Sequence, residues 1–387
     1  MRHLPNILLV SAAVAITGLA CSSPGSPPGE EGTVTWEQER EDADVRDGRW
    51  PPPEPIPGEP HPPSTQPGPA PGPTPTLPAD PLAGLSICPN GVMAEISLDA
   101  LQPPKAGSNG YRVPGAGRLV ALESSIVSLL AGDAQQAQTY AVTAEYLLCR
   151  GEGAEANLAL WRAAPGEGQA RIVVRTGLAR PAIFEAPHPL HDSGTLEQAR
   201  DLFQGLSARA LIVSGTHRCA NSDSSGCSGT TSTCGGISGP FRVSDAAHSE
   251  HSAFHTAHRA LSEHFTHDWV VGVHGMGSPG ASVSDGTEAP VSQNAPSAKL
   301  ATALASRFSD VTTCNPITGS SAIPVANRLC GTTDVQGRHL NGAQLACTSK
   351  PDSASGRFVH LEQSKAVRSA NDAVQSALDE VLPPTGG

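Results

Sequence analysis

Apolar runs and helix-like periodic segments alternate along the chain from residue 86 to residue 387. The pattern predicts strands at residues 140–149, 157–161, 170–175, 182–185, 210–214, 269–273 and 358–361. It predicts helices at residues 119–130, 195–206, 246–264, 297–308 and 364–381. Alternation of strands and helices is typical of a sheet that is covered by helices on both faces. We therefore expect an α/β fold with three α/β/α layers and a mixed, mostly parallel sheet.

Three of the predicted strands lead into residues that can bind a metal ion. His188 and Asp192 follow the fourth predicted strand, His274 follows the sixth, and Glu362 follows the last. Functional groups in α/β sheets collect beyond the carboxyl ends of the strands, so we expect these side chains to meet. Catalytic zinc takes three protein ligands, and a nearby carboxylate accepts the proton of the attacking water. The pattern predicts one Zn²⁺ held by His188, His274 and a third ligand, with Glu362 as general base.

Two residues of one turn compete for the place of the third ligand. Asp192 follows His188 by four positions and supplies a carboxylate, whereas His191 follows it by three. His217, which follows the predicted strand at 210–214, and His360 are the next candidates for the base if Glu362 is not the base.

A second group of histidines has the spacing of a helix face. His248, His251, His255 and His258 are separated by three, four and three residues, which places them on one stripe of a helix. His251 and His255 have the spacing of two metal ligands on a helix, but no Glu lies between them as in the zinc motifs of this kind. We expect one or two of these histidines to border a cleft and the others to be solvated.

The N-terminus has the features of an export signal. A basic start is followed by an apolar stretch at residues 7–19 that is too short for a comfortable membrane span. Cys21 directly follows Gly18-Leu19-Ala20, which resembles a bacterial lipoprotein signal and implies a lipid anchor at Cys21 in the outer membrane or at the cell surface. Ordinary signal-peptidase cleavage before Cys21 is the alternative.

The composition of residues 22–82 differs from that of the rest of the chain. This segment holds 18 of the 36 prolines, with an acidic stretch at residues 30–47, and such a composition does not fold into a packed core. We therefore predict an export signal at 1–20, an extended tether at 21–85 and one α/β domain at 86–387. The net charge of −12, without a basic cluster, argues against nucleic acid as a partner.

Eight cysteines remain if Cys21 is acylated, and an even number in an exported chain suggests disulfides. Sequence alone does not choose among about 105 complete pairings. We expect Cys219, Cys227 and Cys234 to hold together a loop rich in Gly, Ser and Thr.

Four short motifs follow one another across residues 182–370: Pro187-His188, Asp192-Ser193-Gly194-Thr195, Val271-Gly272-Val273-His274-Gly275-Met276 and Val359-His360-Leu361-Glu362-Gln363-Ser364. They resemble the phage-type poly-γ-glutamate hydrolases and, more distantly, N-formylglutamate amidohydrolases and zinc carboxypeptidases. The resemblance implies Asp192 as the third zinc ligand, where the hydrolases have Glu. It also implies that Arg368 binds a substrate carboxylate, and Arg218 is a second candidate for that role.

The resemblance implies a zinc-dependent hydrolase that cleaves an amide bond in a small peptide-like or polymeric substrate. Two alternatives remain open on the same residues. One is a lipid-anchored binding protein that keeps the fold without turnover, and the other is a zinc esterase or phosphatase that uses the same water.

Overall fold

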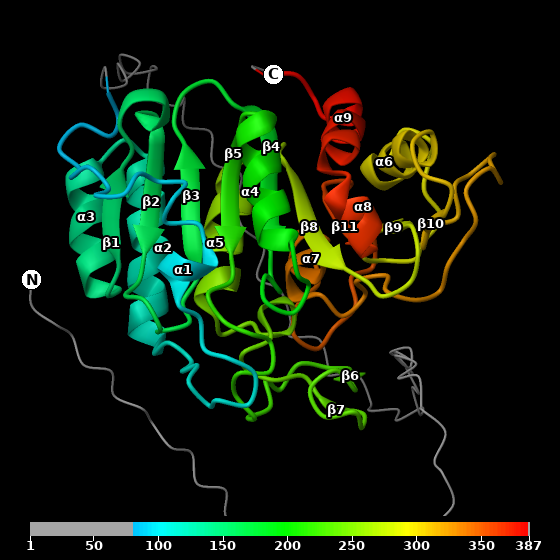
Figure 1. The fold of residues 1–387 in the computed structure, drawn as a ribbon, viewed down its shortest axis with the longest axis horizontal. Helices are drawn as coiled ribbons and strands as arrows, with labels where there is room; N and C mark the ends of the chain where they lie inside the picture. Colours follow the sequence, from blue (N-terminus) through cyan, green and yellow to red (C-terminus); the bar gives the residue numbers. More distant parts are fainter. Residues whose placement is uncertain (1–79, 386–387) are drawn as a thin grey trace, which may run out of the picture. The chain divides into compact units, whose positions relative to one another are not determined.

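The computed structural model describes residues 80–385 and is built around one nine-stranded sheet (Figure 1). In spatial order the strands are β1 (Leu147–Arg150), β2 (Leu158–Arg162), β3 (Arg171–Arg175), β5 (Ala208–Val213), β4 (Arg180–Ala186), β8 (Trp269–Gly275), β11 (Phe358–Gln363), β9 (Ala281–Ser284) and β10 (Val311–Thr313).

The centre of this sheet is parallel and its flanks are largely antiparallel. β5, β4, β8 and β11 run in the same direction, whereas β1, β2 and β3 form an antiparallel meander on one side. β9 pairs antiparallel with β11, and β10 pairs parallel with β9. The predicted α/β class with a mixed sheet is confirmed, and the parallel pairing is concentrated where the chemistry was expected.

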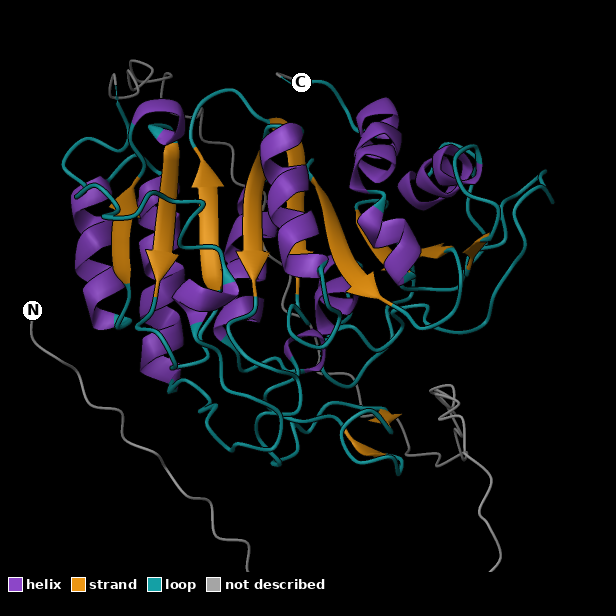
Figure 2. Ribbon diagram, viewed as in Figure 1, coloured by secondary structure: helices purple, strands orange, loops and turns teal. Residues whose placement is uncertain are grey.

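Helices cover both faces of the sheet (Figure 2). One apolar core holds side chains of α4 (Thr195–Gly205), α6 (Pro296–Ala305), α8 (Lys365–Ser369) and α9 (Asn371–Val381). The other core holds side chains of α2 (Ala116–Leu130), α3 (Ala134–Thr143) and α5 (Ala253–His264), and α7 (Val335–Leu340) packs against α5. The strands that lie between are buried on both faces, as their continuous apolar sequences predict.

Three predicted elements differ from those in the structure. Residues 140–149 were expected to form one strand, but α3 continues to Thr143 and only β1 is extended. The helix expected at 246–264 is divided into a 3-10 turn, η2 (Ala246–His248), and α5, because the Ser252 hydroxyl caps α5 by accepting from His255 N. The helix expected at 364–381 is divided at Ala370 into α8 and α9.

Four disulfides link the eight cysteines of the described part: Cys88–Cys149, Cys219–Cys234, Cys227–Cys347 and Cys314–Cys330. Such bonds are typical of proteins from oxidising compartments, which suggests an exported protein. The expected loop is closed on itself by Cys219–Cys234, while Cys227 ties it to the segment after α7. β6 (Thr230–Thr231) lies in this loop and pairs with β7 (Gly239–Pro240), which follows Cys234.

Packing begins slightly earlier than the predicted domain boundary at residue 86, because Leu82 and Leu85 are already buried. The predicted export signal, Cys21 and the predicted tether as far as residue 79 lie outside the described residues. Within residues 80–385, no helix is long and apolar enough to cross a membrane. A short helix, α1 (Leu98–Leu101), and a 3-10 turn, η1 (Gly153–Glu155), complete the described elements.

Candidate metal centre

The polar residues at the ends of the parallel strands lie along one edge of the sheet, where the carboxyl ends of these strands meet. β8 and β11 pair in a register that places Glu362 beside His274. β4 lies on the other side of β8 and ends two residues before His188. The loop with β6 and β7 lies beyond this same edge (Figure 1). The sequence therefore brings the four predicted residues together because their strands share a direction.

A tight turn folds Asp192 back toward the sheet edge. The backbone N–H groups of His191 and Asp192 both donate to the His188 carbonyl, at 3.1 and 2.8 Å. Asp192 Oδ2 then accepts from the N–H of Gly275 at 3.1 Å, directly after His274. A Cβ at position 275 would lie 3.0 Å from Asp192 Cβ and still closer to Arg368, so glycine permits this approach.

Two imidazoles converge on Asp192. Its Oδ2 lies 3.5 Å from His188 Nδ1 and 3.7 Å from His274 Nδ1. All three side chains are buried, and their ligand atoms lie within 4.8 Å of one another. His188 Nδ1 has no hydrogen-bond partner among the described residues. Two imidazoles with one carboxylate are a donor set that catalytic zinc uses, so this group fits the predicted ion.

Asp245 is a further member of the site that the sequence did not reveal. It is buried in the loop before η2, and its Oδ1 lies 2.7 Å from His188 Nε2 and 3.1 Å from His248 Nδ1. Burial lowers the pKa of His188, but Asp245 and Asp192 outweigh it and raise that pKa to about 9. Burial raises the pKa of Asp245, but Arg218, His248 and His188 outweigh it and hold that pKa well below its usual value.

Glu362 lies beside this group in a desolvated position. Its Oε1 is 3.3 Å from His360 Nε2, while its Oε2 is buried and has no hydrogen-bond partner in the part of the chain that the structure describes. Burial raises the pKa of this carboxyl group, and the contact with His360 reduces that rise. His274, His360 and Glu362 form a second group whose ligand atoms lie within 4.8 Å of one another. Glu362 can therefore act as a base or as a ligand at this position.

The other two histidines near the turn lie at its rim. His191 is exposed, and its ring packs edge-on against that of His217 at 5.6 Å between centroids. His217 Nδ1 accepts from the N–H of Cys219 at 3.0 Å. Partial desolvation by the surrounding protein lowers the pKa of both imidazoles, that of His191 to about 4. Neither residue belongs to a group of three or more potential metal ligands among the described residues.

The two arginines predicted to bind substrate both contact protein groups. Arg368 donates through Nε to the Ser193 carbonyl at 3.0 Å and through Nη1 to the Gln363 carbonyl. It thus joins the backbone after Asp192 to the backbone after Glu362. Arg218 is buried and donates through Nε and Nη2 to Asp245 Oδ2, at 2.9 and 2.7 Å. Arg218 therefore supports the site from within rather than facing an open cleft.

The histidine stripe lies partly outside the helix that was expected to carry it. His248 belongs to η2, and His251 is exposed before α5 begins. His258 is buried on α5, and its Nδ1 lies 2.8 Å from Glu185 Oε1. His255 is buried at 5.7 Å from the His258 ring, with His339 of α7 at 5.6 Å. Among the described residues, His248 is the one member of the stripe in a group of potential metal ligands.

Comparisons with known proteins identify no family for this chain. No model of a protein family matches the sequence, and no curated protein matches it. The fold was compared with solved structures, and two provisionally named metallopeptidases were found. The protein from Shewanella amazonensis has 14% identity and a TM-score of 0.28, with 69% of this chain and 92% of that chain covered. The protein from Shewanella denitrificans has 13% identity, a TM-score of 0.28, and coverages of 65% and 91%.

Proposed function

We propose that this chain is an exported zinc-dependent hydrolase that cleaves an amide bond of a peptide-like substrate. The observation that carries the proposal is the convergence of His188 Nδ1 and His274 Nδ1 on one oxygen of Asp192, beside the buried carboxyl group of Glu362. A zinc ion bound there would polarise a carbonyl group and acidify a water molecule. The donor set favours zinc over magnesium or calcium, which prefer oxygen ligands.

In this proposal Glu362 moves the proton. Its carboxylate accepts a proton from the attacking water and returns it to the nitrogen of the leaving amine. A carboxyl group whose pKa is raised by burial is suited to both steps, because it holds the proton more firmly than an exposed one. His360, at 3.3 Å from Glu362 Oε1, orients the carboxyl group so that Oε2 remains available.

An open groove of about 340 Å³ adjoins the turn that carries Asp192 and is the proposed place of the substrate. Ser193, Gln198 and Arg368 lie along it, and Gln198 is hydrogen-bonded to Gln363, next to Glu362. Lys365 is exposed in the same groove and has no ion pair among the described residues. A substrate with a free carboxylate would find a partner there, as the resemblance implied for Arg368.

The decisive variant for chemistry is Glu362→Gln, which keeps the shape of the side chain but cannot accept a proton. Zinc content should remain that of the wild type while amide hydrolysis falls by about 10²–10⁴-fold. Zinc content is measured by elemental analysis and hydrolysis with a panel of peptide and γ-glutamyl amides. Loss of zinc together with activity would instead assign Glu362 as a ligand.

Panels of esters and phosphate esters separate the proposed amidase from an esterase or phosphatase. A zinc-loaded wild type that cleaves none of these compounds would contradict the hydrolase and leave a binding protein. The proposal includes a lipid anchor at Cys21 in a bacterial membrane and no nucleic-acid partner. The Cys21→Ser chain should then leave the membrane fraction, which cell fractionation tests.

A further inference from the structure

The ring of His188 is held from both sides. Its Nδ1 faces Asp192 Oδ2 at 3.5 Å, and its Nε2 lies 2.7 Å from Asp245 Oδ1. An ionised carboxylate can only accept a hydrogen bond, so the ring donates a hydrogen bond from its Nε2–H to Asp245 Oδ1. When a metal ion displaces the proton of Nδ1, the ring keeps its proton at Nε2 and offers the Nδ1 lone pair, and Nδ1 is the atom that faces the candidate metal position.

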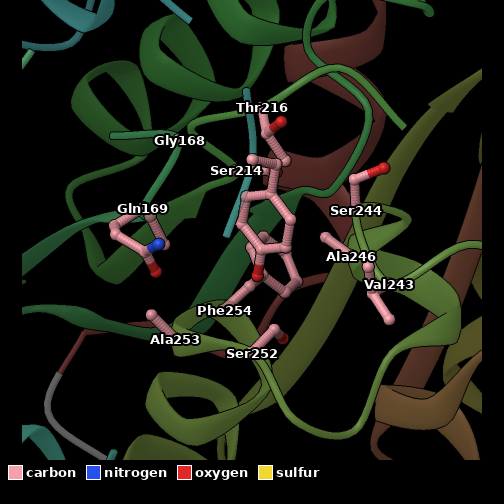
Figure 3. Close-up of a pocket in the computed structure, with 12 residues that line it drawn as sticks. Gly168, Gln169, Ser214, Thr216, Val243, Ser244, Ala246, Ser252, Ala253 and Phe254 are labelled. Atoms are coloured by element: carbon pink, nitrogen blue, oxygen red, sulfur yellow. The ribbon is translucent and has the colours of Figure 1, made fainter. Parts of the chain in front are cut away.

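Asp245 is itself held firmly in place. Its Oδ2 accepts a hydrogen bond from Arg218 Nε and forms an ion pair with Arg218 Nη2 at 2.7 Å, and its Oδ1 contacts both His188 and His248. The cavity behind this segment, between Ser244 and Phe254, measures about 10 Å³, which is close to the least volume that a single water needs (Figure 3). The contacts with Arg218, His188 and His248 thus limit the movement of the buried carboxylate.

His274 has a similar but looser arrangement. Its Nε2 is buried, and the nearest carboxylate oxygen, Asp334 Oδ2, lies 3.9 Å away. The other oxygen of Asp334 caps α7 by accepting from the N–H of Gly337 at 2.8 Å. At 3.9 Å the two atoms are too far apart for a hydrogen bond, so His274 is oriented less strongly than His188.

We propose that Asp245, fixed by Arg218, is the positioning residue that makes His188 a metal ligand through Nδ1. The inference rests on the proposed function, because it assumes a metal ion at His188, Asp192 and His274. It goes beyond that function in assigning a role to the disulfide-closed loop. Arg218 directly precedes Cys219 and Asp245 follows Cys234, so the Cys219–Cys234 bond shortens the covalent connection between the two residues. Carboxylates that orient metal-bound histidines typically contribute about 10–100-fold to metal affinity.

The test is the zinc affinity of the full chain with Asp245→Asn, measured by competition with a chelator. The amide can turn its NH₂ toward His188 and so favour the wrong tautomer, an effect known for Asp→Asn in the Ser-His-Asp triad. We expect zinc binding to weaken by about 10–100-fold. The ¹⁵N chemical shifts of the His188 ring should show Nε2 protonated and Nδ1 bound to metal in the zinc-loaded wild type.

Asp268→Asn is the matched control, because Asp268 is also buried and also paired with an arginine, Arg209, at 3.1 Å. It lies before β8, at the opposite end of that strand from His274, and should lower stability without changing zinc affinity. The inference is overturned if Asp245→Asn retains wild-type zinc affinity, or loses no more than Asp268→Asn does. It stands, while the proposed hydrolase fails, if Asp245→Asn weakens zinc binding but the wild type cleaves no substrate. A wild type that binds no zinc overturns both.

Discussion

The imidazoles of the candidate centre both face Asp192. The surroundings of Asp192 differ from those of His191, one position earlier. Its carboxylate is buried between two imidazoles, whereas His191 is exposed and packs against His217. Asp192→Ala should therefore weaken zinc binding far more than His191→Ala, as measured by chelator competition on the two variants. The opposite order would show that the chain uses His191 as its third ligand.

The sequence made His188, His274 and Glu362 predictable for one physical reason. Each follows a run of apolar residues that is long enough to identify a buried strand, and parallel strands end at a common edge. Asp245 carried no such signal. It lies in an irregular loop, 57 residues from His188 along the chain, and only the folded loop brings the two together.

At the scale of elements, the strand predicted at residues 140–149 was wrong in its first part, because residues that favour strands there belong to a helix. Tyr140, Val142 and Thr143 favour strands, yet they lie in α3. There the buried Ala134, Ala137 and Ala141 form an apolar stripe that packs against α2, and Asp133 caps the helix. The packing of these alanines against α2 outweighs the local preference of their neighbours for a strand.

Helix α5 contributes a buried histidine whose titration should be visible in stability. Burial holds the pKa of His255 well below its usual value, with the nearby His258 and His339 adding to the effect. Below about pH 6.5 the unfolded chain binds a proton here and the native protein does not, so stability falls as the pH falls. One such group contributes a slope of up to about 1.4 kcal/mol per pH unit.

His255→Leu removes this titration. Chemical denaturation of metal-free protein between pH 7 and pH 5 should show a smaller loss of unfolding free energy for the variant than for the wild type. Equal losses in the two proteins would contradict a neutral, buried His255. His274 and His339 contribute in the same direction and His188, whose pKa is raised, in the opposite one, so the comparison depends on the difference between the two slopes.

The disulfide-closed loop offers a second prediction at this scale. A chain with Cys219→Ala and Cys234→Ala should bind zinc more weakly, because the disulfide shortens the covalent connection between Arg218 and Asp245. The matched control changes Cys88 and Cys149 to Ala. This removes a disulfide at β1, the outermost strand on the side of the sheet away from β11. Both double variants should be less stable than the wild type. In a zinc titration, only the variant without Cys219–Cys234 should bind zinc more weakly. Equal zinc affinities for the two double variants would contradict the role given to the loop.

At the scale of the whole molecule, the class of fold followed from the order of elements, whereas the position of the groove did not. Alternating patterns predicted a layered α/β sheet, and the structure has one. The groove beside Asp192 is formed by α4 with the turn before it and by α8 with the start of α9, and these two segments lie far apart in the sequence. A periodic pattern in the sequence does not indicate which distant segments will lie side by side. The class of substrate therefore has to be inferred from the folded domain.

The most direct measurement is anomalous diffraction at the zinc edge from crystals of the zinc-loaded protein. The account predicts one strong peak bounded by His188 Nδ1, Asp192 Oδ2 and His274 Nδ1, with Glu362 near the ion but outside its ligand set. A peak bounded by His274, His360 and Glu362 instead, or no peak at this edge of the sheet, would contradict the central claim.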